Sequence, residues 1–349
     1  MEFDIAQCLN DGQPFACLHL PGSSTIDCHS GAASDLRLYQ SWSELNGAEG
    51  FLIAPFRVDE ETPIVLAQLD LCAQWEFKPK TSSLPFLPSQ TTLPDEAYTR
   101  QFTRFMQVLK HQEFEKLVLA RSIRQALPPL FNPWESFLKA CTLYPQAYTY
   151  LYYTPQTGMW MGSTPEVLLT GNKSSWSTVA LAGTQALEGE QPPRTWSEKN
   201  RQEQAYVSTY IRQLLHELQI LPQEIGPYSV RAGSLAHLKT EFHFSLSSTH
   251  RLGDLLNLLH PTPAVCGLPK AEAYRFICQE ETHRRRYYSG CLGWLRPEGD
   301  TSIYVNLRCM HIENECLTLY AGGGLLSSSN LQDEWNETEK KMQTMRRIL

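Results

Sequence analysis

The last part of the sequence combines acidic and basic side chains at a spacing that could bind a cation and an anion together. Glu334, Glu337 and Lys341 stand at i, i+3 and i+7, so a helix beginning near Asn330 would carry all three on one face. The three glycines at 322–324 predict a turn whose backbone N–H groups can approach an anion. Carboxylates beside an anion repel it unless a divalent cation lies between them. This stretch therefore predicts a magnesium-assisted site for a small carboxylated substrate.

Two residues elsewhere in the chain could carry acid–base chemistry. Lys116 begins an apolar run, where a lysine usually extends its ammonium to solvent, but burial would lower its pKa and make it a base. Glu166 lies in a turn that leads into an apolar strand, where a carboxylate is often a simple turn residue. Burial would raise its pKa, so that it could donate a proton near neutral pH. These two positions alone leave both interpretations open.

Weaker signals accompany these residues. Gly183 and Thr184 end a predicted strand in a glycine turn, whose N–H groups and hydroxyl could hold a carboxylate. His237, taken alone, is more typical of a hydrogen-bonded structural histidine. The prolines at 261 and 263 predict a rigid loop over 260–267.

Two pairs of opposite charge stand at i, i+4 on predicted helices. Lys199 precedes Glu203, and Glu281 precedes Arg285. The first spacing favours a solvated ion pair worth about 0.3–0.5 kcal/mol, and the second favours a structural pair.

Composition and charge exclude several classes of protein. The 349 residues are 42% hydrophobic and 19% charged, and the net charge of −7 argues against nucleic-acid binding. The dense basic run at 284–286 is interpreted as complementing the end of an acidic helix. No apolar window is long enough to span a bilayer, and the acidic residues near the N-terminus do not fit a signal peptide. We therefore expect a cytoplasmic protein that does not bind membranes.

The 10 cysteines contain no C-x-x-C pair and no spacing typical of zinc ligands. We expect them to remain thiols in a reducing compartment, several of them as small core residues.

Strands follow one another without intervening helices, which predicts antiparallel pairing and an α+β fold. The region 1–76 reads as short strands, including 51–54 and 64–67, and 78–94 reads as a linker or long loop. Further strands are expected at 117–123, 147–153, 166–170, 177–181, 290–295, 301–312 and 316–321. Helices are expected from the Asp95 cap to Leu109, at 197–218 and 270–281, and from Asn330 to the end of the chain.

Each motif is weak alone, but their order is specific. The set resembles the chorismate-utilising enzymes over residues 95–349, and within that family the isochorismate synthase branch. It comprises Lys-x-Val-Leu-x-Arg at 116–121, Gly-Ser-x-Pro-Glu at 162–166, Ala-Gly-Thr at 182–184, the Lys…Glu helix start at 199–203, His-Leu at 237–238, His-Pro-Thr-Pro-Ala at 260–264, Arg-Cys at 308–309, Ala-Gly at 321–322 and Glu-Trp-x-Glu-Thr-x-x-Lys at 334–341.

The resemblance implies a fold of two largely antiparallel, twisted sheets sandwiched by helices. It implies one chorismate-binding domain over 1–349, with a catalytic core at 95–349 and a shortened, strand-rich part at 1–94. It also implies the reaction, in which water adds at C2 of chorismate and the C4 hydroxyl leaves, with Lys116 as general base and Glu166 as general acid.

The same resemblance implies a ligand set. Mg²⁺ would be held by Glu203 and Glu337, with Glu334 nearby, directly or through water. The ring carboxylate of chorismate would be helped by Gly183 and Thr184. The remaining implied substrate contacts are Arg308, Gly322 and Lys341 at the enolpyruvyl carboxylate, and His237 and Ala264 beside the ring.

Three alternatives to this function stay open. A salicylate synthase makes isochorismate first and then eliminates pyruvate in the same pocket, whereas the amination enzymes of the family use ammonia from a glutaminase partner. A catalytically inactive member would act as a binding protein. The pathway that uses the product, whether for a quinone, a siderophore or salicylate, is not encoded in these motifs. We expect a monomer because no coiled-coil pattern is present.

Overall fold

The computed structural model describes residues 3–78, 92–189, 191–232 and 235–349. Most of the predicted linker at 78–94 lies outside these residues. None of the helices in the described part of the chain has the length and apolar character needed to cross a membrane.

Two nine-stranded sheets form the centre of the fold, and every ladder between their described strands is antiparallel. The first sheet runs in the order β14 (Gly267–Leu268), β7 (Lys116–Ala126), β18 (Cys316–Leu325), β17 (Cys309–Ile312), β9 (Gly158–Thr164), β8 (Tyr148–Thr154), β1 (Phe15–His19), β2 (Thr25–Ser30) and β6 (Asp70–Glu76). The second runs β12 (Gln223–Ala232), β13 (Leu235–Phe244), β11 (Ser175–Ala186), β10 (Val167–Asn172), β16 (Thr301–Val305), β15 (Cys291–Leu295), β4 (Gly50–Ala54), β5 (Ile64–Ala67) and β3 (Leu36–Tyr39).

Alternating side chains pack the two sheets against each other. In β8, Tyr148, Tyr150 and Tyr152 point into one buried cluster together with Phe51 from β4 of the second sheet, whereas Leu151 points to the opposite face. The cluster with the tyrosines draws on both sheets and therefore forms the layer between them.

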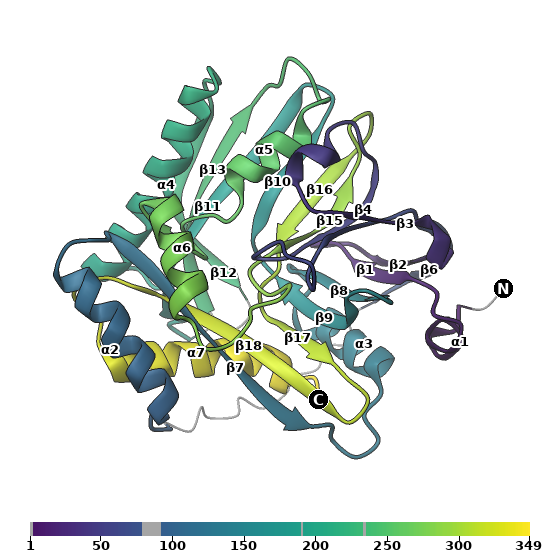
Figure 1. Cartoon of the computed structure of the whole chain (residues 1–349), viewed down its shortest axis with the longest axis horizontal. Coiled ribbons are helices and arrows are strands. Elements are labelled where there is room, and N and C mark those ends of the chain that lie inside the picture. Colours follow the sequence, from purple (N-terminus) through teal and green to yellow (C-terminus); the bar gives the residue numbers. More distant parts are fainter. Residues whose placement is uncertain (1–2, 79–91, 190, 233–234) are drawn as a thin grey trace.

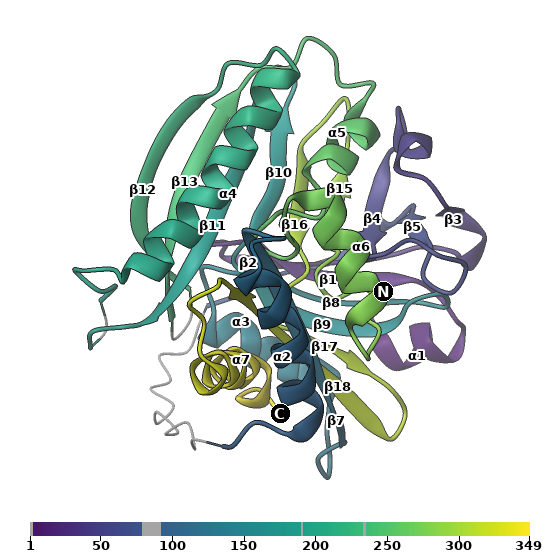
Figure 2. The same cartoon turned by 60° about the vertical axis from the view of Figure 1, so that its left-hand side comes forward.

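Helices cover the outer faces of both sheets (Figures 1 and 2). On the second sheet, α4 (Glu198–Glu217) runs along β11 and β13, and α5 (Leu252–Leu259) packs into the same core. On the first sheet, α3 (Pro133–Leu143) and α7 (Leu331–Arg346) share a core with strand residues, and α1 (Ile5–Asn10) contributes to its edge. A fourth core joins α2 (Glu96–Lys110), α6 (Lys270–Glu280) and β7.

The amino-terminal strands belong to both sheets. The first sheet is extended by β1, β2 and β6, and the second by β3, β4 and β5. The strands expected at 51–54 and 64–67 are confirmed as β4 and β5, and the α+β class is confirmed as well.

Local signals placed most ends of the four expected helices within one or two residues, whereas α1, α3 and α5 were not predicted. Asp95 caps α2 by accepting the Tyr98 N–H at 2.7 Å, and Asn330 caps α7 through the N–H groups of Gln332 and Asp333. The strand expected at 301–312 is instead two strands, because the chain leaves one sheet after Val305 and enters the other at Cys309.

Three other expectations were wrong. Glycines 322–324 lie inside β18 and do not form a turn, and β11 continues through Gly183 by a bulge between Ala182 and Thr184. Cys17 and Cys28, which are paired across β1 and β2, form a disulfide, whereas the other eight cysteines are free thiols.

Truncation of Phe51 tests the layer between the sheets. Phe51 is fully buried and contacts the rings of Tyr152 and Trp294 at centroid distances of 6.4 and 5.4 Å. We expect Phe51→Ala to lower the free energy of unfolding by about 3–5 kcal/mol, measured by denaturant titration. The control Leu71→Ala, at a side chain 56% exposed on β6, should change it by less than about 0.5 kcal/mol. Equal effects of the two variants would contradict this packing.

Candidate active site

A small, largely enclosed cavity lies where β7, β11, β13, β18 and α7 meet. Its volume is about 50 Å³, which has room for a few water molecules but not for a substituted six-membered ring. Most of the predicted site residues line it: Glu166, Gly183, Thr184, Glu203, His237, Ala264, Arg308, Gly322 and Lys341. The sheet topology brings together residues that are more than 150 positions apart in the sequence.

Lys116 is fully buried at the start of β7, so the interpretation that it extends to solvent is wrong. Its Nζ lies 2.9 Å from Oε1 of Glu203 on α4. The two side chains meet over Gly324, where an added Cβ would stand 2.2 Å from Glu203 Oε1 and 2.9 Å from Lys116 Cε. A glycine is required at 324 because the ion pair occupies the space of a side chain.

Glu166 is 3% exposed at the junction between β9 and β10. Burial raises the pKa of its carboxyl to about 7, although the positive charges of Lys116, Arg308 and Lys341 act in the opposite direction. A hydroxyl contact from Thr262 reaches its Oε1 at 3.5 Å. At neutral pH the carboxyl is therefore divided between its acid and its base form, as a proton donor requires.

Glu334 and Glu337 project from the first turns of α7 toward Gly323. A Cβ at that glycine would lie 3.2 Å from Oε2 of Glu334 and 3.5 Å from Oε1 of Glu337. Burial and the neighbouring Glu337 raise the pKa of Glu334 to about 7, and its Oε2 is buried without a hydrogen-bond partner among the described residues. Glu337 is only partly buried, with 19% of its side chain exposed, and Lys341 and Lys199 hold its pKa below the usual value. Lys341 Nζ lies 2.7 Å from Glu337 Oε1 and donates to the Gly322 carbonyl at 2.8 Å.

Lys199 forms an ion pair with Glu334 rather than with Glu203. The predicted i, i+4 pair is therefore wrong, because Glu203 turns inward to Lys116 and Lys199 reaches across to α7. As a result, each of the three predicted metal carboxylates faces a lysine. Across the described ranges, no three His, Cys, Asp or Glu side chains are gathered closely enough to hold a metal ion as they stand.

The donor set nevertheless fits a divalent cation. Magnesium is bound by one or two carboxylates together with water and substrate oxygens. Glu334 and Glu337 converge on one glycine, and one buried carboxylate oxygen has no partner within the described structure. These features indicate a position that a cation would stabilise.

His237 connects two of the predicted substrate-binding positions. Its Nδ1 lies 3.0 Å from the Gly183 carbonyl, which can only accept, so Nδ1 carries the hydrogen. The other nitrogen, Nε2, then accepts from Arg308 Nη2 at 3.3 Å. Burial and the charge of Arg308 lower the pKa of His237 to about 3, which keeps the ring neutral. His237 therefore orients Arg308 without adding charge to the site.

The Gly183–Thr184 backbone differs from the predicted anion cradle. Gly183 has a φ of +72°, and an added Cβ would lie 2.9 Å from the carbonyl oxygen of Asn200. The Thr184 N–H is not free for a carboxylate, because it donates to Asn200 Oδ1 at 3.2 Å. Asn200, on α4, holds this bulge in place.

Sequence reasoning missed three residues at the site. Tyr288 lines the cavity, and its hydroxyl lies 3.0 Å from the position of a Cβ on Gly322. Lys199 and Thr262 contact Glu334 and Glu166, respectively. The i, i+4 spacing of Lys199 pointed to the wrong partner, and Tyr288, which follows the basic run at 284–286, carried no signal of a site.

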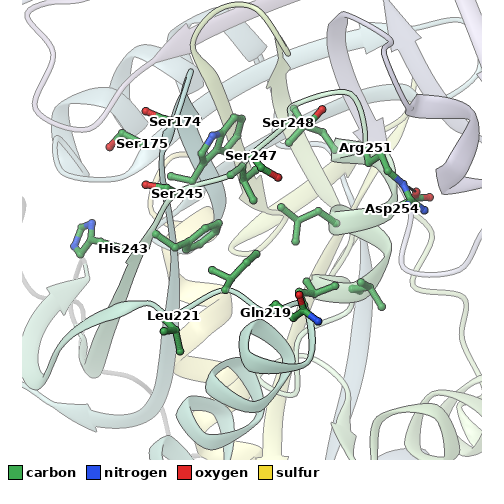
Figure 3. Close-up of a pocket in the computed structure, with 18 of the residues that line it drawn as sticks. Ser174, Ser175, Gln219, Leu221, His243, Ser245, Ser247, Ser248, Arg251 and Asp254 are labelled. Atoms are coloured by element: carbon green, nitrogen blue, oxygen red, sulfur yellow. Dashed lines mark hydrogen bonds and ion pairs between the residues drawn. The ribbon is translucent and has the colours of Figure 1, made fainter.

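Cavity size alone does not identify the site. A more open cavity of about 910 Å³ lies beyond the end of α4, where serines and His243 surround apolar side chains (Figure 3). None of the predicted site residues lines it. The buried charges and the shifted pKa values are in the smaller cavity, which we take as the functional site.

Comparisons with known proteins identify the family of the chain. The family model described as chorismate binding enzyme matches residues 57–349. The chain is 28% identical over 267 residues to isochorismate synthase EntC of Escherichia coli K12, a match that covers 74% of this chain and 67% of that protein. It is 28% identical over 268 residues to isochorismate synthase MenF of the same strain, covering 73% of this chain and 61% of that protein.

Solved structures share the whole fold. MenF, the menaquinone-specific isochorismate synthase from Escherichia coli, superposes with a TM-score of 0.77 at 21% identity, covering 100% of this chain and 92% of that one. Anthranilate synthase component I from Streptococcus pneumoniae gives a TM-score of 0.68 at 17% identity, covering 95% and 89%. At these identities the structural similarity shows the fold alone. The same fold is shared by an isochorismate synthase and by an anthranilate synthase.

The raised pKa of Glu166 predicts a pH-dependent effect of Glu166→Gln on stability. In the folded wild type the Glu166 carboxyl keeps its proton up to a pH of about 7, whereas in the unfolded chain it loses the proton near the usual glutamate pKa of 4.5. The wild type therefore loses stability as the pH rises between these values. Glu166→Gln has no carboxyl at this position. The other titratable groups are present in both proteins, so the comparison is made between the variant and the wild type at each pH. The stability of the variant relative to wild type should rise by about 3 kcal/mol from pH 4.5 to 7 and then stay level. Urea unfolding at pH 5 and pH 8 measures this, and an equal difference at both values would contradict a buried, protonated Glu166.

Proposed function

The chain belongs to the family of chorismate-binding enzymes, and from this premise we propose that it converts chorismate into isochorismate. In this reaction water adds at C2, the ring double bond shifts, and the C4 hydroxyl leaves as water. The observation that carries the proposal is the buried, half-protonated Glu166 at the cavity, together with the buried Lys116 on β7, two residues before Val118, which lines the same cavity. The relatives named isochorismate synthase support the same reaction.

Lys116 is the proposed general base. It would take a proton from the water that attacks C2, and the fully buried position keeps bulk solvent away from this amine. Its Nζ forms an ion pair with Glu203 Oε1 at 2.9 Å. The contact must therefore open before Lys116 can accept a proton.

Glu166 is the proposed general acid. Its carboxyl, with a pKa of about 7, is protonated often enough at neutral pH to give a proton to the departing C4 oxygen. Thr262 and the surrounding burial hold it at the cavity wall. The pair of a lysine base and a raised-pKa carboxylic acid is the division of roles expected of acid–base catalysis.

Positive charge in the cavity suits a substrate with two carboxylates. Arg308, oriented by His237, and Lys341, beside the Gly322 carbonyl, would bind the enolpyruvyl carboxylate. The Gly183–Thr184 bulge and Ala264 would contact the ring end. Because the cavity holds only a few waters, substrate entry requires its walls to move apart.

Magnesium is part of the proposal. Glu203, Glu334 and Glu337 would hold it, and when bound it would neutralise these carboxylates and attract the ring carboxylate. The unpartnered Oε2 of Glu334 and the convergence of Glu334 and Glu337 on Gly323 support this assignment. We also propose a cytoplasmic monomer, with chorismate as the small-molecule partner.

Product analysis tests the function. Purified protein, chorismate and Mg²⁺ without ammonia should give isochorismate by chromatography, and EDTA should abolish the product. The absence of any product without ammonia or a glutaminase would contradict the water reaction. Salicylate and pyruvate appearing together would assign the chain to the coupled lyase reaction instead.

The matched variant for this assay is Lys116→Met, which keeps the length of the side chain without its amine. Loss of the base should lower kcat by about 10²–10⁴-fold. Binding of chorismate should persist in equilibrium dialysis. Unchanged turnover would disprove the role of Lys116.

A further inference from the structure

Beyond the short strand β14, the outer edge of β7 has an ion pair in place of a neighbouring strand. The short strand β14 pairs with β7 at Lys116 and Leu117. Further along this edge, the Val118 carbonyl accepts from Arg285 Nη2 at 2.9 Å, and the Ala120 N–H donates to Glu281 Oε1 at 2.9 Å. Backbone groups at a sheet edge need partners when they are buried. Here two side chains supply them.

The same ion pair extends to a second segment of the chain. Arg285 Nη1 donates to the Val265 carbonyl at 2.7 Å. Arg285 and Glu281 are joined by two hydrogen bonds of 2.6 and 2.7 Å, and their side chains are only 2% and 4% exposed. The guanidinium also lies 4.2 Å from the centre of the Phe56 ring. Arg285 therefore links the edge of β7 to the turn at 262–266 with fixed geometry.

These two linked segments are neighbouring parts of the wall of the catalytic cavity, and the Val118 N–H also donates directly to the Cys266 carbonyl at 2.7 Å. Val118 and Val265 both line it. Lys116 stands two residues before Val118 on the same face of β7, and Thr262, in the linked turn, contacts Glu166. The ion pair itself does not line the cavity. It thus connects the strand that carries the proposed base to the turn that contacts the proposed acid.

Stability alone does not account for this arrangement. A buried ion pair contributes little net stability compared with an apolar pair of the same volume, because desolvation of both charges offsets their attraction. An apolar pair cannot, however, bind the backbone groups of Val118, Ala120 and Val265. The distinguishing property of Glu281 and Arg285 is the position that they impose on these three residues.

We infer that Glu281 and Arg285 are positioning residues. They set the distance between β7, the strand that carries Lys116, and the turn at 262–266, which contacts Glu166. This inference rests on the proposed function. The groups assigned to the substrate carboxylate, Arg308, Gly322 and Lys341, lie on other elements. Loss of the ion pair should therefore affect the chemical step more than substrate binding.

The first test compares adjacent glutamates at the end of α6. Glu281→Gln, which loses the charge that holds Arg285, should lower kcat for isochorismate formation at least tenfold, with the KM for chorismate changed less than threefold. Glu280→Gln is the matched control, because Glu280 forms a partly exposed ion pair with Arg104 at 3.2 Å, away from the cavity. It should leave both constants within twofold of wild type. Equal behaviour of the two variants would overturn the inference.

The second test separates position from stability. In Glu281→Met/Arg285→Met both charges are removed, so no unpaired charge remains and the Tm should exceed that of either single variant. The Val118 and Val265 carbonyls and the Ala120 N–H still lack the partners that the ion pair supplied, so kcat should remain at least tenfold low. Recovery of kcat together with Tm would show that the pair only stabilises the fold.

A third measurement does not depend on the product. Hydrogen exchange of the double variant should accelerate in peptides over 116–121 and 262–266, compared with wild type. Unchanged exchange in both segments would overturn the linkage even if the protein proves to catalyse another reaction. Failure of the proposed function itself would appear separately, as the absence of isochorismate with the wild-type protein.

Discussion

Burial of several charges in one small cavity is the constraint on which the rest of the site depends. Glu203, Glu334 and Glu337 are carboxylates in a region with little solvent, where an unpaired charge is costly. Each meets a lysine: Lys116, Lys199 and Lys341, respectively. The three carboxylates are therefore neutralised by three ion pairs. Entry of a dianionic substrate with a divalent cation would supply the same charges from outside, and this would release the lysines.

The fold makes that arrangement possible because glycines leave space for the charged side chains. Glycines 323 and 324 stand in a strand, β18, and the space above them is filled by the carboxylates from α4 and α7 and by the lysine from β7. A side chain at Gly324 would collide with Glu203. The aromatic layer between the sheets and the helices outside them hold these strands in register, so that charges from distant parts of the sequence meet at one place.

Sequence reasoning succeeded where the signal was local. The cap at Asn330 and the i, i+3, i+7 spacing correctly predicted that Glu334, Glu337 and Lys341 share one face of α7 directed at the site. It failed where the role of a local motif depends on contacts with distant parts of the chain. The glycines at 322–324 looked like a turn, but they make room for ion pairs within a strand, and Lys199 pairs across the molecule instead of along its helix. The disulfide of Cys17 and Cys28 depends on strand register, which spacing along the chain does not reveal.

The central claim is that this cavity activates water against chorismate, and labelled water tests it most directly. The wild-type protein should be incubated with chorismate and Mg²⁺ in H₂¹⁸O, and isochorismate collected at low conversion should be examined by mass spectrometry. The account predicts one ¹⁸O atom in each product molecule, located in the C2 hydroxyl. Unlabelled isochorismate would mean that the C4 oxygen migrates within the substrate, and it would contradict the assignment of Lys116 as the base that activates water.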